Sequence, residues 1–162
     1  MRPLPQLKLD HKVTAVWRVS ELVIVACCWL CIGLPFLIAG IVEDERVLDM
    51  VNLVLGIATI VCLVFFVGIF PRYRYERWRF EVGEHELDIM RGIFWRKRFV
   101  IPFVRVQNTD TKQGPIMRAF GLAQVTVATA AGEHVIPGLT VEQADELRDA
   151  IATQARLAQE DL

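Results

Sequence analysis

Two long stretches without a charged residue dominate the chain. Each of them, 22–42 and 50–70, runs for 21 residues without Asp, Glu, Lys or Arg. At about 1.5 Å per residue, a helix of that length crosses the roughly 30 Å hydrocarbon core of a bilayer. Backbone amides left unpaired in lipid are costly, so both stretches should be helical. A chain of 162 residues could not wrap two such helices in a soluble core. The pattern therefore predicts a two-helix transmembrane hairpin over 22–70, joined by a short linker at 43–49.

The pattern changes to alternation after the second stretch, which is typical of β-strands. Apolar and polar residues alternate over six segments, with Gly- or Pro-containing breaks between most of them. They are 73–82, 85–92, 93–102, 103–113, 122–130 and 133–139. The segment 115–121 is too short for a strand and predicts a single helical turn or a loop. From Thr140 onward an apolar stripe at helical spacing predicts an amphipathic helix with Thr140 as its N-cap. Residues 71–162 should therefore form a small barrel or bent sheet capped by a C-terminal helix.

Residues 1–21 precede the first apolar stretch. Leu9, Val13, Val16 and Trp17 recur at helical spacing, which indicates a short interfacial helix. The alternative is that this segment simply extends the first span. The stretch 22–42 exceeds the apolar core of about 7–15 residues found in signal peptides, so we interpret it as an uncleaved anchor.

Positive charge flanks both predicted spans on the same side. The preceding segment holds Arg2, Lys8, Lys12 and Arg18, and the following one holds Arg72, Arg74, Arg77 and Arg79, whereas the linker is acidic. Positive flanks remain in the cytoplasm. The sequence thus predicts a multi-pass membrane protein with both termini cytoplasmic, and the family resemblance given below implies that the membrane is a bacterial plasma (inner) membrane.

The overall charge points to no nucleic-acid partner. The net charge is −1, without the basic excess that nucleic acid requires. Cys27, Cys28, Cys31 and Cys62 all lie in the predicted spans, where we expect them to pack as small soft side chains rather than bind metal. The three histidines have no nucleophile beside them, and the chain has no P-loop, Rossmann glycine pattern or zinc spacing. We therefore expect no enzyme, no cofactor and no metal.

Two groups of polar residues are candidate binding sites. Arg105 and Gln107 should share one face of a strand, with Val104 and Val106 in the core on the other face. Arg118 lies on the short turn that follows. These residues could fix the local geometry or bind a partner or an anionic headgroup. The second group, Arg96, Lys97 and Arg98 beside Phe94 and Trp95, could meet anionic lipid or form an ordinary solvated hairpin.

The order of motifs resembles the bacterial pleckstrin-homology (PH) family, specifically its YdbS-like membrane-flanked members. The resemblance rests on RWRFEV (77–82), IMRGIFWRKRFVIPFVRVQ (89–107), QGPIMRAFGLAQV (113–125) and VATAAGEHVIPGL (127–139). Phe80 and Pro137 depart from the family pattern.

The resemblance implies an α+β membrane protein in which the hairpin precedes a PH-like sheet of about seven strands closed by the C-terminal helix. It implies no catalytic residues. It also implies a scaffold or complex subunit at the cytoplasmic face, whose partner is another membrane protein of the family or a second copy of the chain. Binding of anionic lipid through the basic hairpin is the alternative function.

Overall fold

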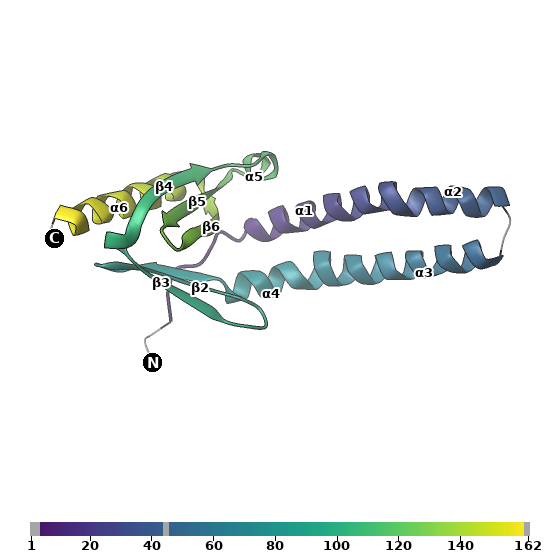
Figure 1. The fold of residues 1–162 in the computed structure, drawn as a ribbon, viewed down its shortest axis with the longest axis horizontal. Coiled ribbons are helices and arrows are strands. Elements are labelled where there is room, and N and C mark those ends of the chain that lie inside the picture. Colours follow the sequence, from purple (N-terminus) through teal and green to yellow (C-terminus); the bar gives the residue numbers. More distant parts are fainter. Residues whose placement is uncertain (1–3, 44–45, 161–162) are drawn as a thin grey trace. The chain divides into compact units, whose positions relative to one another are not determined.

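The chain folds into two compact units, which the computed structural model describes for residues 4–43 and 46–160 (Figure 1). The helical unit comprises Trp17–Arg72. The sheet unit comprises the residues up to Val16 and those from Tyr73 onward. Residues on both sides of the helical hairpin thus contribute to one sheet unit. Arg2, Asp44 and Glu45, which entered the charge argument for orientation, lie outside the described residues.

The helical unit consists of two long helices, each with a short π-helical segment. The first runs through α1 (Val13–Cys28), η1 (Trp29–Gly33) and α2 (Leu34–Glu43), and the second through α3 (Arg46–Cys62), η2 (Leu63–Ile69) and α4 (Phe70–Arg77). The stretches Val13–Ile41 and Leu48–Arg77 are long and apolar enough to cross a membrane. Both begin before the spans predicted at 22–42 and 50–70, and the second also continues past residue 70.

A proline follows each π-helical segment at the same distance. Leu34 donates its backbone N–H to Trp29, and Phe70 donates to Phe65, each five residues back. Pro35 and Pro71 come next. Proline lacks an N–H, and its ring clashes with the carbonyl four residues earlier. A wider turn just before the proline relieves that clash and keeps the helix continuous.

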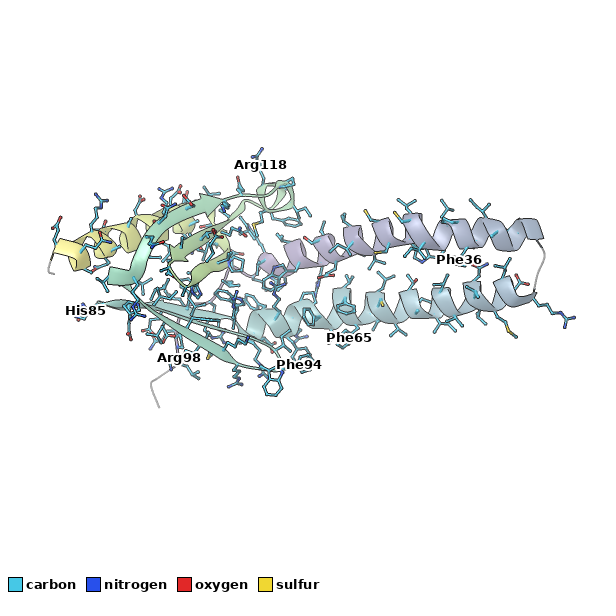
Figure 2. The ribbon with its side chains drawn as sticks, viewed as in Figure 1. Phe36, Phe65, His85, Phe94, Arg98 and Arg118 are labelled. Carbon is cyan, nitrogen blue, oxygen red and sulfur yellow. The ribbon has the colours of Figure 1, made fainter. Side chains whose placement is uncertain are left out.

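Polar side chains join the two long helices. Trp29 Nε1 donates a hydrogen bond of 2.9 Å to Thr59 Oγ1, and Thr59 in turn donates to the Leu55 carbonyl at 2.7 Å. Nearer the linker, Asn52 Nδ2 donates to the Phe36 carbonyl at 3.3 Å. A Cβ at Gly40 would lie 2.6 Å from that nitrogen, so glycine permits the close approach. Phe36 and Phe65 lie on these helices in Figure 2.

The sheet unit contains two antiparallel sheets of three strands each. The first has the order β1 (Arg79–Val82), β2 (Glu86–Arg91) and β3 (Lys97–Pro102). A 3₁₀ turn, η3 (Phe103–Arg105), leads to the second sheet, which has the order β4 (Val106–Lys112), β5 (Leu122–Thr129) and β6 (Gly132–Thr140). α5 (Pro115–Ala119) joins β4 to β5. β5 is the central strand of its sheet and has buried residues on both faces.

The N-terminal segment connects the two sheets at one seam. Leu7 and Phe80 exchange backbone hydrogen bonds of 3.0 Å, which adds an isolated bridge to β1. Three residues later, the Asp10 N–H donates to the Gly138 carbonyl of β6 at 2.8 Å. Residues 7–10 therefore link the outer strand of the first sheet to the outer strand of the second.

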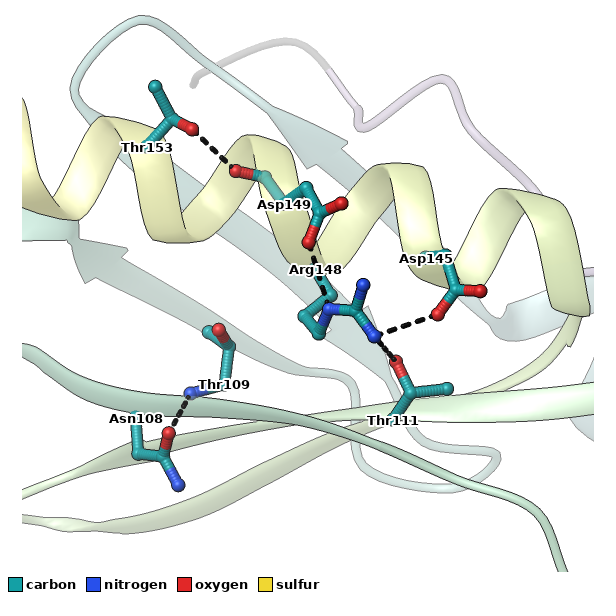
Figure 3. A network of polar contacts seen from close by, with 7 residues as sticks. All are labelled: Asn108, Thr109, Thr111, Asp145, Arg148, Asp149 and Thr153. Atoms are coloured by element: carbon teal, nitrogen blue, oxygen red, sulfur yellow. Dashed lines mark hydrogen bonds and ion pairs between the residues drawn. The ribbon is translucent and has the colours of Figure 1, made fainter.

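Helix α6 (Val141–Glu160) packs against the second sheet through the predicted apolar stripe (Figure 1). Ala144, Leu147, Ile151 and Ala155 are buried, while Val141 at the helix start is exposed. Thr140 and Gln143 form a reciprocal capping box, in which each side chain accepts the other's backbone N–H at 3.2 Å. On the polar side, Arg148 binds Asp145 at 2.8 Å and Asp149 at 2.9 Å and reaches Thr111 of β4 (Figure 3).

The structure departs from three predictions about this unit. The described residues form six strands in two sheets, not one sheet of about seven. The strand predicted over 73–82 is helical as far as Arg77, because α4 continues the second long helix and imposes its conformation on the alternating residues. The strand predicted from 103 begins at Val106, because the chain first turns through η3. The single helical turn at 115–121 is confirmed, with Pro115 at its first position and Gly121 at φ 66° after it.

The N-terminal segment before the first span differs from the predicted interfacial helix. Among the described residues, α1 begins at Val13 and continues into the span without a break. Leu9, Val13, Val16 and Trp17 are all buried. Leu9 lies ahead of the helix, in the segment that connects the two sheets.

Candidate binding cleft

A cleft of about 900 Å³ lies where the chain passes from the first sheet to the second. One wall is a continuous run of chain, from Arg98 in β3 through η3 to Gln107 in β4. The other wall comes from the β5–β6 turn, His134 and the last turn of α6. The lining of the second wall consists of Thr129, Ala130, Ala131, His134 and Gln159. The cleft is thus at the seam between β3 and β4, whereas the N-terminal segment connects β1 and β6 at the other seam.

Local sequence explains why this seam is open. β3 has a strand neighbour on one side only within the described part of the chain. It ends at Pro102, which has no N–H to donate to a further strand. Phe103 then enters the core with no exposed surface, and its neighbour Val104 points outward with 40% exposure. In β4 the pairing with β5 shifts between Val106 and Asn108, so a bulge opens the start of the second sheet.

An aromatic cluster links the two sheets at the cleft. The rings of Phe99 in β3 and His134 in β6 lie 5.0 Å apart between centroids, and the Arg91 guanidinium lies 5.1 Å from the centre of the Phe99 ring. The His134 Nδ1 atom is buried and has no hydrogen-bond partner among the described residues. Burial, with a smaller contribution from the Arg91 charge, lowers the pKa of His134 below its ordinary value. His134 is therefore neutral at physiological pH.

The charged residues of the cleft wall are all cationic. Arg98 and Arg105 line the cleft, and a smaller groove between β4 and α6 continues from it past Val106, Gln107 and Gln159 to Arg156. The described lining residues of the cleft and the groove include no Asp or Glu. Such a surface favours an anionic or acidic ligand.

Arg98 does not contribute its charge freely. Its Nε atom donates to both Asp88 oxygens, at 3.0 and 2.8 Å, from the neighbouring strand β2. Hydrogen bonding to Asp88 raises the pKa of Arg98 further above its ordinary value. Asp88 is only 8% exposed, so the pair is part of the sheet itself. Arg105 has no side-chain hydrogen bond or ion pair with the described residues, and it supplies the available charge.

The six residues predicted as binding candidates fall into three places. Arg98, Arg105 and Gln107 line the cleft. Arg96 and Lys97 lie at the tip of the β2–β3 hairpin. Lys97 belongs to the last strand pair, and Arg96 lies just beyond it. Arg118 projects from α5 (Figure 2). Arg96–Lys97–Arg98, a single cluster in sequence, is therefore divided between the tip and the cleft.

Sequence reasoning missed several lining residues. Strand alternation predicts Val104 in the core, and that prediction is wrong because η3 turns the side chain out. His134 and Gln159 come from segments far along the chain, and no local pattern marks them. The local signals that marked the cleft were Arg105 with Gln107 and, from the basic cluster, Arg98.

The arrangement is suited to binding a ligand. The cleft combines apolar side chains, a strand edge and a few polar groups, as ligand and peptide sites do. No group of three or more His, Cys, Asp or Glu side chains in the described ranges could hold a metal ion.

Comparisons with known proteins extend over the whole chain. A family model described as bacterial PH domain matches residues 15–155. The UPF0699 transmembrane protein YdbS of Bacillus subtilis (strain 168) is 38% identical over 172 aligned positions, which cover 100% of both chains. The UPF0699 transmembrane protein YdbT of the same organism is 27% identical over 82 residues, which cover 48% of this chain and 17% of that protein. No solved structure matches significantly.

Proposed function

This chain belongs to the bacterial PH domain family and is a membrane protein, and on that premise we propose that it is a non-catalytic interaction module tethered to the cytoplasmic face. The hairpin holds the sheet unit at the membrane. The cleft between β3 and β4 binds a segment of a partner in a membrane complex.

The observation that carries this proposal is the cleft along an edge strand. β3 forms one wall, and the edge of a sheet can accept an extended segment through main-chain hydrogen bonds. Val100 and Val104, 38% and 40% exposed, offer apolar contacts beside that edge. Arg105 and Arg156 supply positive charge along the wall and groove. The chemistry suits an extended partner segment that carries carboxylates.

The partner we propose is a second membrane protein of the same family. Similarity to part of a much longer family member supports the existence of such relatives in one bacterium. A membrane partner would lie in the same bilayer as this chain, which raises the effective concentration of the partner at the cleft. Self-association of the chain is the competing outcome.

The orientation is a further part of the proposal. The sheet unit contains residues from before the first helix and from after the second, so both ends of the hairpin belong on one side of the membrane. Lys8 and Lys12 precede the first membrane helix and Arg18 lies near its start, whereas Arg72, Arg74 and Arg77 lie at the end of the second. By the positive-inside rule that side is the cytoplasm of a plasma membrane. A reporter that is active only in the cytoplasm should be active when fused to either terminus. A reporter that is active only outside the cytoplasm should be inactive at both.

Purification of the tagged full-length protein from its native membrane tests the partner directly. In mild detergent, the intact mass should correspond to this chain plus one other membrane protein of the family. A bare monomer, or a complex of identical chains, would contradict the proposed partner.

Two valines provide a matched pair of variants for the same purification. Val104 and Val141 are 40% and 41% exposed, but only Val104 lines the cleft. Val104→Glu should release the partner by placing a carboxylate in a cationic, partly apolar wall. Val141→Glu, at the start of α6, should retain it. If both variants retain the partner equally, the cleft does not bind it.

A second candidate function, contact with anionic lipid, is favoured by a different surface. Arg96 and Lys97 are exposed at the tip of the β2–β3 hairpin, and neither has an ion pair with a described residue. Each basic residue close to an anionic membrane surface contributes about 1 kcal/mol of attraction.

A further inference from the structure

The tip of the β2–β3 hairpin exposes two aromatic side chains. Phe94 and Trp95 are each 82% exposed, more than any other large hydrophobic side chain among the described residues, those of the membrane helices included. Figure 2 shows Phe94 at the tip and His85, in the turn between β1 and β2, at the opposite end of the same sheet. Exposure of this extent in a sheet unit calls for an environment other than water.

The tip is held in shape by its base. Arg91 and Lys97 form the last pair of the hairpin. Gly92 has a φ of 123°, and a Cβ there would lie 1.9 Å from the Trp95 carbonyl oxygen, so the backbone folds tightly on itself. The Arg91 guanidinium packs over Phe99 inside the hairpin. The two aromatic rings are therefore presented by a preorganised turn.

The register of the first sheet shows at which end of the sheet the tip lies. Arg79, the first residue of β1, pairs with Met90, one residue before the end of β2. The tip thus lies at the end of the sheet where β1 begins. Only Trp78 separates β1 from Arg77, the last residue of the second long helix. The tip is therefore at the end of the sheet at which the chain enters β1 from α4.

The residues around the tip match a membrane surface. Trp and other aromatic rings concentrate at the boundary between headgroups and hydrocarbon, because that region accommodates both an apolar body and a polar edge. Arg96 and Lys97 follow directly and would meet anionic headgroups.

We propose that Phe94 and Trp95 insert into the interfacial region of the membrane that anchors the chain, with Arg96 and Lys97 on its headgroups. This second attachment point would fix the orientation of the sheet unit at the bilayer. The inference rests on the proposed lipid contact and adds aromatic insertion to it. It does not depend on the partner cleft.

Depth measurements on the full-length chain in vesicles test the insertion. The four native cysteines, all free, are replaced by alanine, and a single cysteine is placed by Phe94→Cys or, as the matched control at the other end of the sheet, by His85→Cys. Each carries an environment-sensitive fluorophore. The vesicles contain equal parts of phosphatidylglycerol and phosphatidylcholine, with lipids spin-labelled at the headgroup or along the acyl chain as quenchers.

Insertion predicts that a label at position 94 shifts to the blue and is quenched several-fold more by spin-labelled lipid than a label at 85. Equal quenching by lipid at both positions, with equal access to a water-soluble quencher, would overturn it. Protection of position 94 in native membranes but not in these vesicles would also overturn it, and would assign the tip to a protein partner.

The charged flank separates insertion from simple lipid contact. With Arg96→Gln and Lys97→Gln together, quenching at position 94 should fall in anionic vesicles and change little in pure phosphatidylcholine. If position 94 stays in water while the charge substitutions still reduce anionic-lipid binding, lipid contact stands and insertion fails. If position 94 stays in water and the charge substitutions leave anionic-lipid binding unchanged, both the lipid contact and the insertion fail.

Discussion

Gly138 of β6 lies directly against Val13, the first residue of α1. A Cβ at Gly138 would lie 2.3 Å from Val13 Cγ2, and Gly138 has a φ of 63°. Val13 is fully buried. The neighbouring Asp10 N–H donates to the Gly138 carbonyl, so the same residue holds the N-terminal segment and the start of the helix.

Gly138→Ala should therefore destabilise the protein. A non-glycine residue at positive φ is strained, and the methyl group must displace Val13, which together predict a loss of roughly 2 kcal/mol or more. Thermal unfolding of the detergent-solubilised protein measures this loss of stability. Gly114→Ala is the control, because a Cβ there meets nothing within 4 Å. Equal midpoints for the two variants would contradict the packing described.

The three consecutive basic residues at 96–98 should behave differently. Arg98→Ala leaves the nearly buried Asp88 carboxylate without its two-point hydrogen bond and should lower the unfolding midpoint. Arg96→Ala removes a cation that has no ion pair with a described residue and should leave the midpoint unchanged. A comparable loss in both variants would argue against a structural role for Arg98.

Stability should depend on the protonation of His134. Its pKa is lowered in the folded protein, mainly by burial, so below the ordinary histidine value of 6.5 the unfolded chain binds the proton more readily. Stability is thus fully present above pH 6.5 and declines as the pH falls toward the lowered value. Unfolding midpoints measured across this range should fall with pH in the wild type.

His134→Gln should flatten that decline, because the titrating group is gone. His85→Gln, at an exposed turn, should leave it intact. An unchanged pH profile in the His134 variant would show that another group is responsible.

The hydrogen bond between Trp29 and Thr59 should couple the two membrane helices. Polar contacts between membrane helices contribute on average about 0.6 kcal/mol in double-mutant cycles. Unfolding of Trp29→Phe, Thr59→Val and the double variant in detergent gives the coupling. Strict additivity would indicate that the bond contributes nothing.

Much of the fold could be predicted from the sequence because the relevant patterns are local. Uncharged stretches of membrane length, the strand alternation at 85–92 and the capping box at Thr140 each act over a few residues. The conformation of Tyr73 and Tyr75 could not be predicted this way. Both alternate with charged residues as in a strand, but the helix preceding them continues through this segment.

The candidate site was only partly predictable for a related reason. Arg105 and Gln107 marked one wall of the cleft, but His134 and Gln159 reach it through the tertiary fold. Val104 shows the limit most clearly. A single 3₁₀ turn moves it from the expected core to the cleft wall, and alternation alone contains no sign of that turn.

The most direct test of the partner cleft is photocrosslinking in the native membrane. A photoreactive amino acid is placed at position 104 or, as control, at the equally exposed position 141 of the full-length chain, and the mass of the adduct is measured intact. If the cleft binds the partner, position 104 should give one adduct, with a second membrane protein of the family, and position 141 none. No adduct from 104, or the same adducts from both positions, would contradict it.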